Sequence, residues 1–255
     1  MALVVYDAVS KVDTKTLAER VVKVGPDTVV LQQHWSAENG RGGTGGAEPD
    51  AELGFGGVVR DAAVVLAAYL RPRTTGLRCI ELGCGPGLGA IACALGGASE
   101  SVATDGDRDV IDGLCKPNLA RCAAPAKARA DVLLWGDDAA ADALGPPFDL
   151  CHVADCAAFV YRAAWPALQA SMRRLSSRVW MSYTRRDASE DGFFAALAEQ
   201  GWTRERVAQD ALLADFDPRR SDPKARVTGG PSDMATGDIA VFLFTREPEA
   251  EGHVT

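Results

Sequence analysis

The stretch ELGCGPGLG, residues 81–89, decides the fold, because it has the composition of a tight turn between a strand and a helix. Residues 78–82 (RCIEL) favour a strand, and the small residues 87–95 (GLGAIACAL) favour a helix. Gly83, Gly85 and Gly87 have no Cβ, so the backbone there can adopt positive φ and approach a ligand closely. The free N–H groups at the start of the helix can bind an anion.

The glycines are compatible with three interpretations of this turn: a site for S-adenosylmethionine, a site for a dinucleotide, or a turn that binds no ligand. Residues 85–90 (GPGLGA) also satisfy the loose dinucleotide pattern G-x-G-x-x-A. Glu81 favours S-adenosylmethionine, because dinucleotide loops usually carry an apolar residue at that position. Asp105, at the end of the next strand, can accept both ribose hydroxyls of either ligand. Trp135 follows the third strand, where an aromatic ring can stack on adenine or pack in the core.

A further polar position follows the fourth strand, in the sequence His152-Val153-Ala154-Asp155-Cys156. The carboxyl ends of parallel strands line the ligand crevice of such sheets. Asp155 is therefore predicted to lie where an acceptor meets the methyl donor. The alternative is a helix-capping aspartate.

The remaining chain alternates strands and helices, which predicts an α/β fold: a seven-stranded, mostly parallel twisted sheet with helices on both faces and an antiparallel last strand. The predicted strands are residues 28–32, 78–82, 101–105, 128–134, 148–153, 178–183, 202–209 and 239–245. The predicted helices are residues 58–70, 87–95, 108–122 (disturbed by Pro117), 164–176 and 187–200, the last capped by Asp187. Residues 40–57, with eight glycines, and residues 215–237 are predicted loops.

Composition argues against several classes of function. The net charge of −8 disfavours a nucleic-acid-binding surface. No apolar run approaches the ~20 residues of a membrane span, and the first residues lack a secretory signal. The seven cysteines and three histidines show no metal-ligand spacing, so we expect no metal and interpret the cysteines as small core residues of a reducing compartment.

Taken together, these residues resemble the seven-β-strand protein lysine methyltransferases, in particular the group of the valosin-containing-protein lysine methyltransferase. The resemblance runs from about residue 31 to residue 182 and includes the final strand. It is carried by residues 31–33 (LQQ), 58–66 (VVRDAAVVL), 80–85 (IELGCG), 104–105 (TD), 134–138 (LWGDD) and 154–156 (ADC).

The resemblance implies S-adenosyl-L-methionine as the methyl donor and a role for each matching position. The expected cofactor-binding residues are Arg60, Glu81, Gly83, Cys84, Gly85, Gly87, Asp105, Trp135 and Ala154. Asp155 would act at the site of methyl transfer, as the start of the family's Asp-x-x-Tyr motif. The chain departs from the family at Arg60, where a Trp is usual, and at Ala158, where the Tyr is usual. Phe159 and Tyr161 are the candidates for the missing aromatic wall.

The sequence thus predicts a methyltransferase that modifies a lysine side chain of a protein. The alternatives are a small-molecule or other side-chain methyltransferase, a weakened cofactor-binding module, and more remotely an NAD-dependent oxidoreductase. We expect a single domain, with residues 1–57 packed on a methyltransferase domain of residues 58–255. The expected protein is cytoplasmic or nuclear and monomeric, and its partner is a protein presenting a lysine, with no nucleic acid or membrane.

Overall fold

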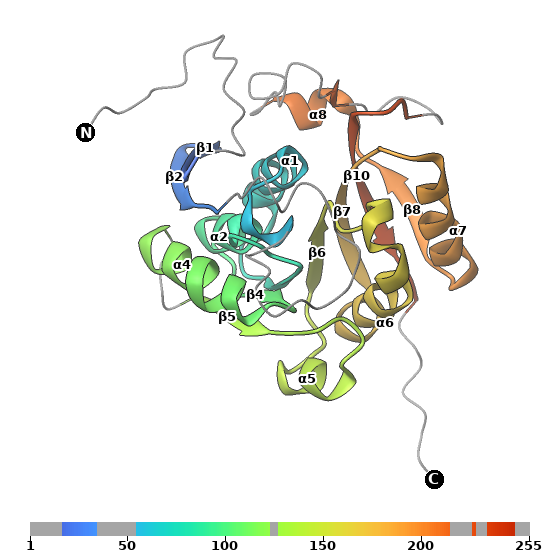
Figure 1. Cartoon of the computed structure of the whole chain (residues 1–255), viewed down its shortest axis with the longest axis horizontal. Helices are drawn as coiled ribbons and strands as arrows, with labels where there is room; N and C mark the ends of the chain where they lie inside the picture. The colour runs from blue at the N-terminus through green and yellow to red at the C-terminus, as the bar shows by residue number, and fades with distance from the viewer. Residues whose placement is uncertain (1–16, 35–54, 123–126, 215–225, 228–233, 248–255) are drawn as a thin grey trace.

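A computed structural model describes residues 17–34, 55–122, 127–214, 226–227 and 234–247 of the chain. Its main sheet has the strand order β5-β4-β3-β6-β7-β10-β8, with the short β9 beside β10 (Figure 1). The strands are β3 (Arg78–Leu82), β4 (Glu100–Asp105), β5 (Ala128–Val132), β6 (Leu150–Ala154), β7 (Arg178–Thr184), β8 (Thr203–Arg206), β9 (Arg226–Val227) and β10 (Asp238–Thr245).

The order and direction of these strands confirm the predicted fold class. Strands β5, β4, β3, β6 and β7 pair in parallel, while β10 runs antiparallel to both β7 and β8. After β3 the chain adds strands on one side, and from β6 onward it adds them on the other. The order therefore reverses between β3 and β6, and ligands of open α/β sheets bind at such a point.

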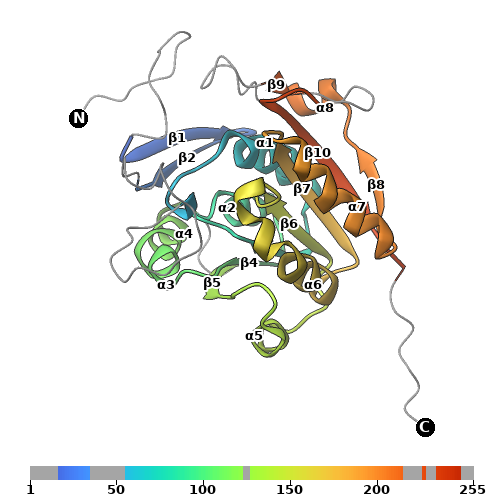
Figure 2. The same cartoon turned by 45° about the vertical axis from the view of Figure 1, so that its right-hand side comes forward.

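Helices cover both faces of the sheet, as Figures 1 and 2 show. One face carries α1 (Asp61–Leu70), α2 (Leu88–Leu95), α3 (Arg108–Val110) and α4 (Lys116–Cys122). The other carries α5 (Asp138–Ala143), α6 (Trp165–Leu175) and α7 (Asp191–Glu199). The stripe predicted for α6 is confirmed, since Trp165, Leu168, Met172 and Leu175 are all buried.

The predicted strand at residues 28–32 is β2 (Asp27–Gln32), which pairs with β1 (Glu19–Val24) in a separate antiparallel hairpin. Arg20 of this hairpin is buried, donates to the Val59 carbonyl oxygen at 2.5 Å and pairs with Asp61. From α4, the Asn118 amide nitrogen donates to the carbonyl oxygens of Gln32 (2.9 Å) and Pro86 (3.0 Å). The hairpin is thereby fixed against the start of α1 and the glycine loop.

The predicted helix at residues 108–122 is disturbed, as expected, but the interruption lies before Pro117, which itself belongs to the first turn of α4. Between α3 and α4 lies a π-helical turn, Ile111–Cys115. Proline has no N–H and its ring displaces the carbonyl group of the residue four positions earlier. The wider π turn immediately before Pro117 accommodates this disturbance.

Several short elements were not predicted. They are β1, α5, α8 (Gln209–Leu213) and β9, the last inside the predicted loop at 215–237. The helix predicted at residues 58–70 begins only at Asp61, and most of the glycine-rich stretch at 40–57 lies outside the described residues. Asp187 caps the next turn as predicted, accepting from the Ser189 N–H at 2.8 Å.

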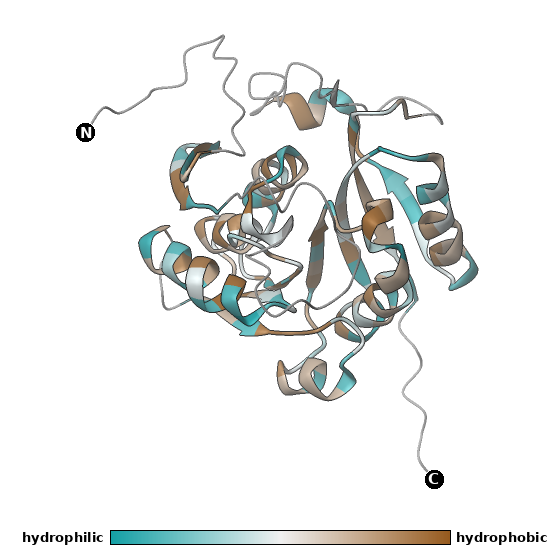
Figure 3. Cartoon of the chain, viewed as in Figure 1, coloured by the Kyte–Doolittle hydropathy of each residue, from teal (hydrophilic) through white to brown (hydrophobic). Residues whose placement is uncertain are grey.

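Apolar residues concentrate on the central strands (Figure 3), and their side chains form the buried core together with apolar side chains of the helices. Six of the seven cysteines are buried and Cys122 is half-buried, all as free thiols, which confirms their prediction as core residues. No helix among the described residues is both long enough and apolar enough to cross a membrane.

Candidate active site

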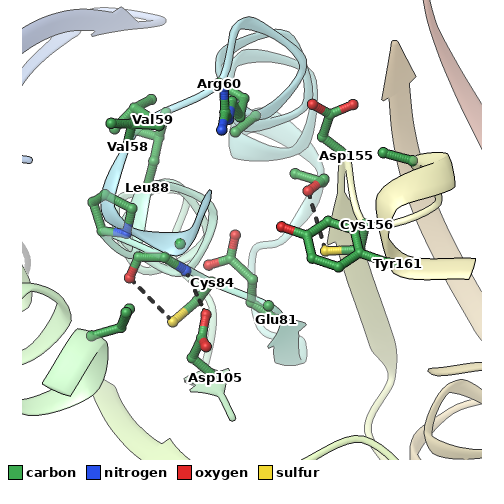
Figure 4. Close-up of a pocket in the computed structure, with 18 of the residues that line it drawn as sticks. Val58, Val59, Arg60, Glu81, Cys84, Leu88, Asp105, Asp155, Cys156 and Tyr161 are labelled. Atoms are coloured by element: carbon green, nitrogen blue, oxygen red, sulfur yellow. Dashed lines mark hydrogen bonds between the residues drawn. The ribbon is translucent and has the colours of Figure 1, made fainter. Parts of the chain in front are cut away.

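A cavity of about 370 Å³ opens at the carboxyl ends of β3, β4 and β6, where the strand order reverses (Figure 4). Of the residues predicted from sequence, its lining includes Arg60, Glu81, Gly83, Cys84, Gly85, Asp105, Trp135, Ala154, Asp155 and Tyr161. Gly87 and Phe159 do not line it. Its volume is that of a small-molecule site.

The glycine loop forms one wall of the cavity through close backbone approach. Gly85 has φ 50°, and a Cβ added there would lie 2.7 Å from the Gly56 carbonyl oxygen. Gly83 has φ 69°, and a Cβ there would lie 2.7 Å from Cys156 Sγ and 3.1 Å from the Trp135 ring. The loop therefore needs glycine at both positions.

Glu81 accepts a hydrogen bond from the first turn of α2. Its side chain is 2% exposed, and Oε2 accepts from the Ala90 N–H at 2.8 Å. Burial raises the pKa of Glu81 to about 8. Because this N–H already donates to Glu81, a dinucleotide pyrophosphate would have to compete for the helix start.

Asp105 ends β4 and faces the cavity. Its Oδ2 accepts from the Gly85 N–H and its Oδ1 from the Asp107 N–H, each at 3.1 Å. Burial raises the pKa of Asp105, while these two N–H groups act in the opposite direction. The carboxylate thus holds the glycine loop and presents acceptor oxygens to the cavity.

Two aromatic rings line the cavity and contact each other. Trp135 and Tyr161 meet edge to face, with ring centroids 5.9 Å apart and an interplanar angle of 80°. Tyr161 belongs to a 3-10 turn, Phe159–Ala164, and burial raises its pKa. Phe159, from the same turn, is 46% exposed, so of the two predicted aromatic residues only Tyr161 lines the cavity.

Asp155 follows β6 with φ 63°, a conformation that non-glycine residues rarely adopt. Its carboxylate receives two bonds from the Arg186 guanidinium, 2.9 Å to Oδ1 and 2.5 Å to Oδ2. The Thr184 N–H also donates to Oδ1, at 3.1 Å. Such strain persists where surrounding contacts fix the residue, and it is common at active sites.

Arg186 was not predicted, although the topology contains the signal. It follows β7, the parallel neighbour of β6, so both residues emerge at the same sheet edge. Arg60, immediately before α1, also lines the cavity, and burial lowers its pKa against the opposing effect of Asp155. Figure 4 shows Arg60, Asp155 and Tyr161 around one end of the cavity and Cys84 and Asp105 at the other.

The comparisons with known proteins agree with this geometry. Residues 47–200, more than half of the chain, match the family model described as "Lysine methyltransferase". The chain belongs to this lysine methyltransferase family. As a family member, it is an S-adenosylmethionine-dependent methyltransferase.

Two solved methyltransferases with TM-scores above 0.5 share the fold. A SAM-dependent methyltransferase from Streptococcus mutans aligns with TM-score 0.53 and 12% identity over 90% of this chain and 56% of that chain. SMU.776, a methyltransferase complexed with SAH, aligns with TM-score 0.54 and 12% identity over 89% and 56%. A TehB-like SAM-dependent methyltransferase from Corynebacterium glutamicum gives TM-score 0.48 and 19% identity over 75% and 90%.

The residues present fit the family's methyl donor. Gly83 and Gly85 line the cavity with backbone, Asp105 offers carboxylate oxygens, and Trp135 offers a ring. S-adenosylmethionine supplies a methyl group on a sulfonium. All of these groups line the same cavity, where they could contact different parts of this donor.

Proposed function

We propose that this methyltransferase modifies the side-chain nitrogen of a lysine in a protein. The observation that carries the proposal is that Asp155 and Tyr161 both line one end of the cavity in a member of the lysine methyltransferase family. The position of the family Tyr is Ala158, which also lines the cavity. Tyr161, three residues further on, supplies the aromatic wall there.

In the proposed assignment the two ends of the cavity have different tasks. Asp105 binds the ribose, Trp135 contacts the adenine, and Gly83, Cys84, Gly85 and Ala154 form the donor wall. Asp155 and Tyr161 orient the incoming amine, and correct positioning can contribute several kcal/mol to the rate. The face of the Tyr161 ring also favours the cationic methylated product.

The lysine must reach the site as a neutral amine, because only that form has a free lone pair. A free lysine has a pKa of about 10.4, so desolvation near the cavity must favour its neutral form. No residue of the cavity is assigned as a dedicated base. The proton leaves to solvent before the amine enters.

The proposal is tested by supplying purified protein, a desalted cell lysate and methyl-labelled S-adenosylmethionine. We expect labelled protein bands whose acid hydrolysates contain methyl-lysine, and a Tyr161→Phe variant that retains part of the rate. Label in another amino acid, or none in protein, contradicts the proposal. Phe159→Ala is the matched control, because Phe159 does not line the cavity.

A second candidate is a small-molecule acceptor that carries a carboxylate. It is favoured by two guanidinium groups, those of Arg60 and Arg186, which line the cavity near Asp155. The same labelling experiment separates the two candidates. Label in a small acidic compound of the lysate, with none in protein, supports the second candidate.

A further inference from the structure

Three hydrogen bonds hold the carboxylate of Asp155, which leaves one of its roughly four acceptor sites for an incoming amine. Arg186 binds both of its oxygens in a two-pronged ion pair, and the Thr184 N–H binds one of them. Asp155 is 7% exposed, and its own N–H donates to the Ser182 carbonyl oxygen at 2.9 Å. A carboxylate bound in this way keeps its position but has its charge largely compensated.

Arg186 is itself held in place by a second, fully buried carboxylate. Its backbone N–H donates to Glu190 Oε2 at 2.9 Å, and its Nη1 also donates to the Thr184 carbonyl oxygen at 2.9 Å. Glu190 further accepts from the Asp187 N–H (3.0 Å), the Phe159 N–H (2.9 Å) and the Tyr183 hydroxyl. The loops after β6 and β7 are therefore joined through Glu190 and Arg186.

We propose that Arg186 is a positioning residue of the methyl-transfer site, which holds Asp155 and cancels its charge at the acceptor end. The arrangement keeps Asp155 as a fixed hydrogen-bonding wall without creating a site for cations. An unpaired carboxylate there would bind a lysine as its ammonium form, which has no free lone pair. With Arg186 in place, the neutral amine is the form that the site accepts.

The other groups around this pair do not replace Arg186. Cationic Arg60 faces it from the start of α1, with Arg20 of β1 behind Arg60. The remaining titratable groups that face the pair or its neighbours are Tyr161, Cys156, Tyr183, Glu190, Glu81 and Asp105. Of these, Glu190 is bound to the backbone of Arg186, and Asp105 lies at the donor end. Counted as formal charges, Arg60 and Arg186 balance Asp155 and Glu190, so removal of Arg186 leaves an excess negative charge beside Asp155.

The donor and its product give a direct probe of this charge, since S-adenosylmethionine differs from S-adenosylhomocysteine by a methyl group and one positive charge. We expect Arg186→Gln to raise the affinity for S-adenosylmethionine relative to S-adenosylhomocysteine by roughly three- to tenfold, measured by calorimetry. Arg186→Lys, which retains the charge, should stay near the wild-type ratio. The double variant Asp155→Asn/Arg186→Gln should also return to it.

Arg185→Gln is the matched control, because Arg185 forms an equivalent two-pronged ion pair with exposed Asp191, at 2.6 and 2.9 Å. Its ratio should remain that of wild type. A ratio in Arg186→Gln within twofold of wild type overturns the inference. So does an equal change in the charge-retaining Arg186→Lys.

A second arm rests on the proposed lysine acceptor. With saturating methyl-labelled donor and lysate protein as the acceptor, Arg186→Gln should shift the acidic limb of the pH–rate profile to higher pH by about one pH unit. A rate that falls equally at every pH indicates a merely structural role and contradicts the inference. If wild type labels no protein, the proposed function fails, while the affinity ratio still decides the role of Arg186.

Discussion

Glu81 and His152 face each other in the core on the neighbouring strands β3 and β6, with 3.8 Å between Glu81 Oε1 and His152 Nδ1. Burial raises the pKa of Glu81 to about 8 and lowers the pKa of His152 to about 3. Near neutral pH, the folded protein therefore keeps a protonated carboxyl beside a neutral imidazole. This pair lies directly behind the cavity wall that Glu81 helps to form.

The Glu81–His152 pair predicts the pH dependence of folding stability. The contribution of Glu81 is fully present below its unfolded pKa of 4.5 and is lost as pH rises toward 8. The contribution of His152 is present above its unfolded pKa of 6.5 and is lost as pH falls toward 3. Their slopes oppose each other between 4.5 and 6.5, so the pair predicts a plateau there and a decline on either side.

The Glu81→Gln variant isolates one half of this effect. Gln retains an oxygen for the Ala90 N–H but has no proton to lose. We expect wild type to lose about 2 kcal/mol of unfolding free energy from pH 6.5 to pH 8 through Glu81, and Glu81→Gln not to show this loss. Urea titrations across the range measure it. Parallel curves for the two proteins would show that Glu81 does not titrate there.

A second prediction concerns the glycine loop. Gly85→Ala should lower the affinity for S-adenosylhomocysteine at least about tenfold, because its methyl group would press on the Gly56 carbonyl oxygen at 2.7 Å. Gly76 also has positive φ, 77°, but a Cβ there meets nothing within 4 Å. Gly76→Ala should therefore cost about 1–2 kcal/mol of stability and leave binding unchanged. Equal losses of binding in the two variants would contradict the proposed role of the loop.

A third prediction concerns the proposed adenine contact of Trp135. Trp135→Ala should weaken binding of S-adenosylhomocysteine by roughly 1 kcal/mol or more, and Trp135→Phe should retain part of that binding. Leu134, which directly precedes Trp135 and is 66% exposed, provides the control Leu134→Ala. Calorimetry measures all four proteins. Wild-type affinity in Trp135→Ala would assign the ring to packing against Tyr161 and Gly83.

A fourth prediction concerns the stability of the acceptor end. Glu190→Ala removes a buried acceptor of four hydrogen bonds and should lower the unfolding free energy by about 2–4 kcal/mol. Exposed Glu199→Ala on α7 should change it by no more than about 0.5 kcal/mol. The donor end lies across the cavity, so binding of S-adenosylhomocysteine should survive in Glu190→Ala. An effect on stability no larger than that of Glu199→Ala would show that this carboxylate does not join the two loops.

The sequence predicted those strands and helices that have a clear hydrophobic periodicity or a clear capping or breaking residue at one end. The strand at 78–82 has the predicted bounds, and Asp187 caps where it was expected. Short elements escaped because four or five residues carry too little periodicity, as in α5 and α8. Their formation depends on tertiary packing, which local sequence does not encode.

The site divides in the same way. Residues next to recognisable strand ends, such as Gly85, Asp105 and Asp155, were predicted to meet and do line one cavity. Arg186 has no sequence pattern of its own, since its partner lies 31 residues away across the β6–β7 pair. Phe159 is exposed whereas Tyr161 lines the cavity, although both belong to the same 3-10 turn. The orientation of that turn decides which ring enters the cavity, and the local sequence does not determine that orientation.

The most direct test is a calorimetric titration of wild type and Asp105→Asn with S-adenosylhomocysteine, with NAD in parallel. The structure predicts that wild type binds one S-adenosylhomocysteine per chain and does not bind NAD. Asp105→Asn should bind it at least about tenfold more weakly, while Asp109→Asn, on the exposed side of α3, binds as wild type does. Wild-type affinity in Asp105→Asn, or no binding of S-adenosylhomocysteine by wild type, would contradict the assignment of this cavity to the methyl donor.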